Sequence, residues 1–210
     1  MLVRDRMFKH PVTTKPDASV PDALKVIQGA KVRQLPVLDK NGALVGIVSL
    51  ADLFRASPSP ATSLSVWEID YLLEQIKVES VMTKKVITAT EDMPLEEAGR
   101  IMADNRISGL PVIRGNELVG MISESELFST LMELFGARRE GVRVMAKMEL
   151  VKGGLARLAG AVADAGGQFV EFVIDPSDEA VTFKVQNVGK EELAKAIKPH
   201  VVEIMDIRDT

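Results

Sequence analysis

The chain has 210 residues, of which 46% are hydrophobic and 27% charged, and its formal net charge is −4. This composition is typical of a globular protein with one or two cores, and the acidic balance argues against nucleic-acid binding. Cysteine is absent, which excludes disulfides and thiolate chemistry, and no apolar run approaches the roughly 20 residues of a membrane span. The N-terminal stretch also lacks a secretory signal, so we expect a cytoplasmic protein.

Residues 12–56 predict five elements. Ser19 is a suitable N-cap, because its side chain can accept a hydrogen bond from the first helical turn, where Pro21 is also favoured. The elements are a strand end at 12–13, a helix after Ser19, strands at 35–38 and 44–48 joined by a turn at 39–42, and a helix that begins at Ser49. This unit has the order β-α-β-β-α.

The same unit occurs a second time after a linker at residues 57–77, which begins with Ser and Pro and then predicts a helix. Residues 7–54 align with residues 82–128 at an offset of 75, which falls to 74 after a one-residue deletion in the turn. The second copy predicts a helix at 95–105, strands at 110–113 and 118–122, and a helix from 123 to about 135. Because one unit of a repeat cannot bury its apolar face alone, we expect the copies to stack and leave two related clefts.

The pattern changes beyond a glycine- and arginine-rich boundary near residues 136–141. The remaining elements are strands at 142–150, 169–174, 180–185 and 201–207, with helices at 155–165 and 191–197. Their order, β-α-β-β-α-β, is ferredoxin-like. We therefore predict an α+β chain with domains at 1–56, 78–137 and 141–210, and a linker at 57–77.

The repeat resembles a tandem pair of CBS (cystathionine-β-synthase-type) motifs, also called a Bateman module. The first copy carries the resemblance in Leu35-Pro36-Val37-Leu38-Asp39 and in Gly46-Ile47-Val48-Ser49-Leu50-Ala51-Asp52-Leu53, and residues 110–113 and 120–127 are their counterparts. The resemblance covers nearly all of residues 1–135. It implies that an adenosine nucleotide binds in the cleft between the motifs.

In this family an acidic residue of a Gly-x-x-Ser-x-x-Asp stretch holds the ribose hydroxyls, and its Ser or Thr lies near phosphate. The resemblance nominates Ser49 and Asp52 in one cleft, Ser123 and Glu126 in the other, Arg33 and Ser108 near phosphate, and Thr13, Thr14, Thr88 and Ala89 beside the base. These ten residues are the predicted nucleotide site.

The nominated residues support two interpretations. Ser49 and Ser123 each begin a helix, whose unpaired N–H groups favour an anion, and Arg33 can hold phosphate with its planar fork. A carboxylate such as Asp52 can accept hydrogen bonds from both ribose hydroxyls. However, Ser49 with Asp52, and Ser123 with Glu126, also match the capping box, which needs no ligand.

The C-terminal segment resembles an ACT domain. The resemblance lies in Gly153-Gly154-Leu155 between the first strand and helix, although the usual Asp-x-x-Pro-Gly-x-Leu loop lacks its proline here. In ACT domains this turn lies at a dimer interface and can hold an amino acid, so Lys152, Gly153 and Gly154 are a candidate ligand loop. A glycine pair also suits an ordinary strand-to-helix turn or dimer packing alone. CBS motifs followed by an ACT-like segment resemble the bacterial acetoin-utilisation B-type proteins.

These patterns predict a non-catalytic, energy-sensing regulatory protein that binds AMP, ADP or ATP, with S-adenosylmethionine and NAD ranked behind them. Occupancy would be transmitted through a homodimer or a protein partner, in acetoin or related carbon metabolism. The alternative is an amino-acid-responsive ACT regulator or a ligand-free dimerisation scaffold.

No catalytic residue, metal site or required cofactor is predicted. The only histidines, His10 and His200, lie far apart in the sequence, and nothing resembles an activated nucleophile or a phosphate-binding P-loop. We likewise expect no nucleic-acid or membrane partner.

Overall fold

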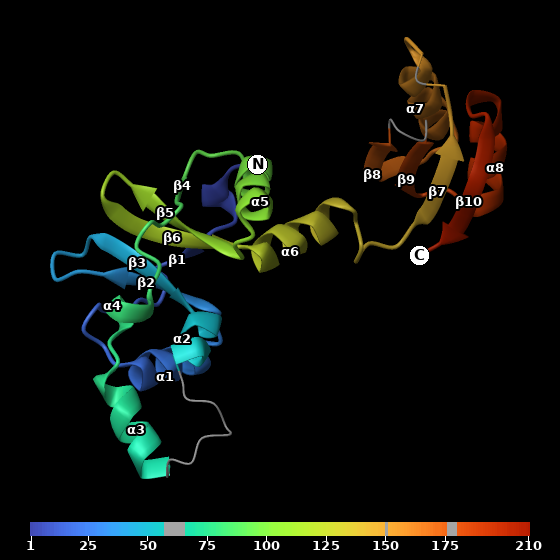
Figure 1. Ribbon diagram of the computed structural model, residues 1–210. Coiled ribbons are helices and arrows are strands. Elements are labelled where there is room, and N and C mark those ends of the chain that lie inside the picture. The colour runs from blue at the N-terminus through green and yellow to red at the C-terminus, as the bar shows by residue number, and fades with distance from the viewer. Residues whose placement is uncertain (57–65, 150, 176–179) are drawn as a thin grey trace. The chain divides into compact units, whose positions relative to one another are not determined.

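The computed structural model describes residues 1–56, 66–149, 151–175 and 180–210 (Figure 1). Residues 57–65 of the predicted linker and residue 150 of the predicted strand at 142–150 lie outside this description. The chain divides into two units, Met1–Leu127 and Phe128–Thr210, here called unit 1 and unit 2. No helix in the described ranges is long and apolar enough to cross a membrane.

The first repeat of unit 1 has most of its predicted elements. The predicted elements are α1 (Val20–Ala30), β2 (Gln34–Leu38), β3 (Leu44–Ser49) and α2 (Leu50–Ala56). Two elements that were not predicted precede them, η1 (Val3–Asp5) and β1 (Phe8–Lys9). Ser19 caps α1 as predicted, because its Oγ accepts a hydrogen bond from the Asp22 N–H at 3.3 Å. The strand end predicted at 12–13 is wrong. The next residue, Thr14, forms a single parallel bridge with Val37 instead.

The second repeat follows the same plan. Its elements, with two preceding helices, are α3 (Val66–Gln75), α4 (Val78–Val81), β4 (Ala89–Thr90), α5 (Leu95–Asn105), β5 (Gly109–Arg114), β6 (Glu117–Ser123) and α6 (Glu124–Leu134). Helix α5 has the predicted bounds, whereas the short helix α4 was not predicted. The residue after α1, Lys31, and the residue after α5, Arg106, both have a φ of 54°. This left-handed turn leads each helix into its hairpin.

The repeats exchange their N-terminal segments. Strand β1 lies at the start of the first repeat but pairs antiparallel with β6 of the second, within a sheet of order β1-β6-β5-β4. Conversely, Thr83 lies at the start of the second repeat and bridges Ile47 in β3 of the first. The cores follow the same exchange, because Val3 packs in the core of the second repeat and Val78 in that of the first. Each repeat is therefore completed by the N-terminal segment of the other.

Two glycines make room for this exchange. A Cβ at Gly46 would lie 2.4 Å from the Met82 sulfur, and a Cβ at Gly120 would lie 2.6 Å from the Met7 sulfur. Both distances are far below van der Waals contact, so the absence of a side chain lets each methionine lie against the middle of its strand.

The described part of unit 2 contains a four-stranded antiparallel sheet and the helices that pack against it. Its elements are β7 (Val142–Lys147), α7 (Gly154–Asp164), β8 (Gln168–Asp175), β9 (Ala180–Gln186), α8 (Lys190–Ile197), η2 (Lys198–His200) and β10 (Glu203–Asp209), and the sheet order is β10-β7-β9-β8. Leu158 of α7 and Leu193 of α8 share one core with Phe183 of β9. Strand β10 begins two residues later than predicted, and η2 lies between it and α8. Helix α6 begins in unit 1 and ends in unit 2.

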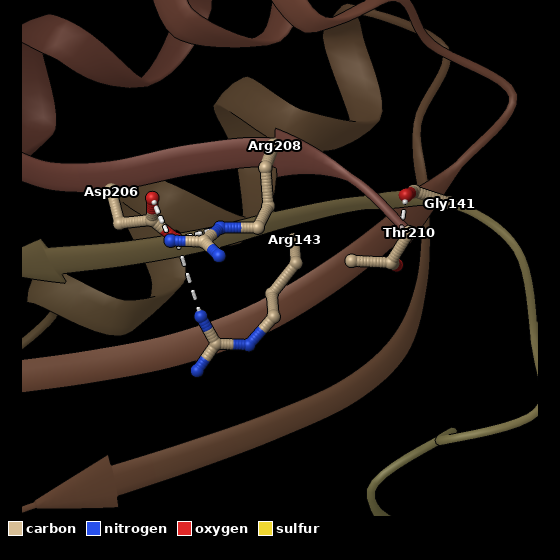
Figure 2. A network of polar contacts seen from close by, with 5 residues as sticks. All are labelled: Gly141, Arg143, Asp206, Arg208 and Thr210. Atoms are coloured by element: carbon tan, nitrogen blue, oxygen red, sulfur yellow. Dashed lines mark hydrogen bonds and ion pairs between the residues drawn. The ribbon is translucent and has the colours of Figure 1, made fainter.

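Polar contacts join the neighbouring strands β10 and β7 of unit 2 (Figure 2). Asp206 accepts hydrogen bonds from Arg208 at 2.8 and 2.7 Å and lies 3.4 Å from the Arg143 guanidinium. The hydrogen bonds from Arg208, followed by the charges of Arg208 and Arg143, hold the pKa of Asp206 below its ordinary value. Gly141 and Thr210 exchange backbone hydrogen bonds with N···O distances of 3.1 and 2.9 Å. The last strand is thus held along its full length.

Candidate functional site

A cleft of about 900 Å³ lies between the two repeats of unit 1. The first repeat lines it with Arg33, Gln34, Ile47, residues 49–52 and Phe54, and the other wall consists of Thr83, residues 85–87, residues 106–109 and Glu124. Gln34 Nε2 donates a hydrogen bond to Ser108 Oγ at 3.0 Å and so joins the two walls. The exchanged segment around Thr83 is what brings residues 85–87 to this cleft.

Four of the ten nominated residues line the cleft together, namely Arg33, Ser49, Asp52 and Ser108. They are separated by up to 75 positions in the sequence, yet the packing of the repeats gathers them at one site. The carboxyl side chain of Asp52 is 24% exposed and is therefore accessible from the cleft. This arrangement keeps the predicted ribose and phosphate contacts available to one ligand.

The other six nominated residues do not line this cleft. Ala89 is buried in β4, where it pairs with Val112, and the buried Thr14 bridges Val37. Thr13 and Thr88 are half-buried beside these positions. The last two nominated residues, Ser123 and Glu126, pair with each other at the start of α6.

Asp52 and Ser49 form the complete capping box. The Ser49 N–H and Oγ–H both donate to Asp52 Oδ2, at 2.9 and 2.5 Å, and the Asp52 N–H donates to Ser49 Oγ at 3.2 Å. Among the described residues, the other carboxylate oxygen, Oδ1, makes only an ion pair of 3.6 Å with the largely exposed Arg55. The structural interpretation of this pair is therefore correct, but Oδ1 retains lone pairs for a further hydroxyl donor.

The counterpart box in the second repeat has a longer acid. The Ser123 N–H donates to Glu126 Oε2 at 3.1 Å, and the Ser123 hydroxyl makes a short hydrogen bond to the same oxygen. The Ser125 N–H also donates to the Ser123 hydroxyl at 3.3 Å. The capping interpretation thus accounts for this pair as well.

The sequence prediction missed two cations and an apolar wall of the cleft. Lys85 and Arg106 line it, as do Val86, Ile87 and Ile107. The sequence did offer a signal for Arg106. It lies two residues before the nominated Ser108, and its counterpart in the first repeat, Lys31, is also basic. Lys85 could be found only from the segment exchange. With three cations, two carboxylates and apolar side chains, the cleft can bind a ligand that is partly anionic and partly flat and apolar.

The described ranges contain no cluster of three or more His, Asp or Glu side chains that could hold a metal ion. In unit 2 the candidate loop at Lys152, Gly153 and Gly154 is a tight turn that begins α7. Gly153 has a φ of 78°, and the Gly154 N–H donates to the Val151 carbonyl at 2.9 Å. An ordinary strand-to-helix turn explains this glycine pair.

The family model described as "CBS domain" matches residues 3–59 and 78–133. The chain belongs to the CBS domain family. This match covers both repeats and ends before β7, so it says nothing of the sheet of unit 2.

Two curated relatives illustrate how CBS pairs occur in other proteins. An uncharacterised protein of Methanocaldococcus jannaschii is 31% identical over 156 residues, which cover 63% of this chain and 92% of that protein. The L-aspartate semialdehyde sulfurtransferase of the same organism is 30% identical over 141 residues, 66% of this chain. The match spans only 24% of that enzyme.

Solved structures of CBS proteins are similar to about two thirds of this chain. A CBS domain pair in complex with 5′-methylthioadenosine and S-adenosyl-L-methionine is 29% identical with a TM-score of 0.53, covering 66% of this chain and 98% of that chain. CBSX2 in complex with AMP is 28% identical with a TM-score of 0.52, covering 62% and 96%. A Vibrio cholerae protein named for acetoin utilization (AcuB) is 28% identical with a TM-score of 0.54, covering 66% and 95%. The two bound structures both hold adenosine compounds.

Proposed function

We propose that this CBS protein is a non-catalytic regulatory protein that binds an adenosine ligand in the cleft between its repeats. The observation that carries the proposal is the convergence of Asp52, Arg33 and an apolar wall on one cleft. The similarity to two CBS structures that hold adenosine compounds supports it. AMP, ADP and ATP are the ligands we rank first.

Each part of such a ligand has a partner in the cleft. Oδ1 of Asp52 can accept a hydrogen bond from a ribose hydroxyl, because the capping box occupies only Oδ2. Ile47, Val86 and Ile107 offer an apolar surface to the base. Arg33 can donate two parallel hydrogen bonds to phosphate. Binding would draw the two walls together across the Gln34–Ser108 hydrogen bond.

A regulatory role requires that the ligand binds one arrangement of the protein better than another. We propose that unit 2, with its β-α-β-β-α-β order, is an ACT-like domain that relays occupancy through a homodimer or a partner protein. The likeness to AcuB supports a process in acetoin or related carbon metabolism. In this proposal the turn at residues 152–154 packs at the dimer interface.

Isothermal titration with AMP, ADP, ATP and NAD tests the proposal, using wild type and Asp52→Ala. We expect Asp52→Ala to weaken binding about tenfold or more, since a lost hydrogen bond to a charged group costs about 1.5–3 kcal/mol. Glu126→Ala is measured beside it, because Glu126 is the acid of the equivalent capping box, is nominated in the other cleft and does not line this one. Circular dichroism checks that each variant folds.

The proposal fails if no adenosine compound binds, or if Asp52→Ala binds as tightly as wild type. Thermal stabilisation by an amino acid, with no response to any adenosine compound, would instead favour an ACT-type regulator whose CBS pair is a scaffold.

A further inference from the structure

More basic than acidic residues line the cleft. Three cations line it, Arg33, Lys85 and Arg106, against two acids, Asp52 and Glu124. All three cations are exposed, and none of their side chains has a hydrogen bond or an ion pair with another described residue. These cations are therefore available to an incoming ligand.

One of the two acids is already compensated. Asp52 accepts two hydrogen bonds from Ser49, and its other oxygen is paired with Arg55, which lies outside the cleft lining. Only Glu124 opposes the three cations with a charge that has no described partner. The potential inside the cleft is thus positive, which attracts anions and repels cations.

The cations reach the cleft from separate parts of the fold. Arg33 precedes β2, Arg106 occupies the left-handed turn after α5, and Lys85 comes from the exchanged segment. A ligand held by all three would contact both walls at once. A phosphate group suits such a set, because guanidinium groups bind its oxygens in pairs and an ammonium adds a point charge.

We infer that this cleft selects adenosine ligands by charge, with Lys85 and Arg106 as specificity-determining residues that favour phosphate-bearing ligands over thioether and sulfonium ones. This inference rests on the proposed function and deepens it. 5′-Methylthioadenosine has no anionic group, and S-adenosylmethionine carries a net positive charge, so neither satisfies the three cations. AMP, ADP and ATP share the same nucleoside and add negative charge in steps.

The test is isothermal titration of the full chain with 5′-methylthioadenosine, S-adenosylmethionine, AMP, ADP and ATP at low and high salt. We expect AMP to bind at least tenfold more tightly than 5′-methylthioadenosine, with an advantage that shrinks as salt rises. Lys85→Met and Arg106→Asn should each weaken AMP binding about tenfold and leave 5′-methylthioadenosine binding unchanged. Asparagine suits the left-handed backbone of residue 106.

The chain offers a matched control for each variant. Lys84→Met removes an exposed lysine next to Lys85 that does not line the cleft, and Lys31→Asn changes the repeat counterpart of Arg106 at the same φ of 54°. Both controls should keep wild-type affinity for AMP. Equal losses in variants and controls would overturn the inference.

The outcomes separate this inference from the proposed function. If 5′-methylthioadenosine or S-adenosylmethionine binds wild type as tightly as AMP, selection by charge is wrong and the adenosine site stands. If none of the five compounds binds, the proposed function fails and this inference fails with it.

Discussion

The buried ammonium group of Lys184 should hold the end of α6 to the sheet of unit 2. Lys184 lies in β9 and is only 4% exposed. Its Nζ donates hydrogen bonds to the carbonyl oxygens of Gly136 and Arg139, both at 3.0 Å. Replacing it in Lys184→Met keeps much of the side-chain volume but removes both hydrogen bonds. We expect this variant to loosen the turn at residues 136–139.

Two effects determine how far Lys184→Met should lower the free energy of unfolding. Each of the two hydrogen bonds from the charged donor contributes about 1.5–3 kcal/mol to stability. Burying a methionine instead of an ammonium group offsets part of their loss, so we expect the free energy of unfolding to fall by about 3 kcal/mol. In addition, Glu171 is paired across the strands with Lys184 and is 9% exposed, and its Oε2 has no hydrogen-bond partner among the described residues. Without the ammonium group this carboxylate loses its neighbouring cation. Adding Glu171→Gln to Lys184→Met should therefore recover part of the loss.

Urea unfolding followed by hydrogen exchange and mass spectrometry measures this effect, because peptides from β7 and β9 report on unit 2 separately from unit 1. Lys147→Met is the control, since Lys147 is an exposed lysine on the neighbouring strand β7. The reasoning is refuted if Lys184→Met lies within about 0.5 kcal/mol of wild type, the range of ordinary surface substitutions. The reasoning is also refuted if Lys147→Met lowers the free energy of unfolding as much as Lys184→Met does.

Two further predictions concern packing and pH. Gly120→Ala should lower the free energy of unfolding by about 1–3 kcal/mol, and by more than Gly46→Ala, because a Cβ at Gly120 also meets a backbone oxygen at 3.0 Å whereas Gly46 faces only the flexible Met82 side chain. Thermal unfolding measures both, and equal costs would contradict this ranking. Arg208→Gln should raise the pKa of Asp206 toward 3.8. The stabilisation from Asp206, present above pH 3.8 and lost as pH falls through its lowered folded pKa, should then shrink, and an unchanged Asp206 midpoint by NMR would contradict this.

Local patterns were enough to predict most helices and strands. Helix α5 has its predicted bounds, and the capping roles of Ser19 and of the Ser49–Asp52 pair follow from residue types three positions apart. The hairpins of both repeats also lie where alternating apolar residues and turn residues predicted them. Such features are predictable because capping and periodicity depend on neighbours within one helical turn or one hairpin.

The composition of the cleft depended on contacts between distant segments. Arg33 and Ser108 could be nominated from the family resemblance, but Lys85 could not, because it reaches the cleft only through the exchange in which Thr83 pairs with β3. The strand predicted at 12–13 failed for a related reason, since a single bridge to Val37 replaces it. Which strand a short segment joins depends on the free energy of burying its apolar residues in one core or another. Tertiary packing therefore decides which strand the segment pairs with, and the sequence of the segment alone does not predict it.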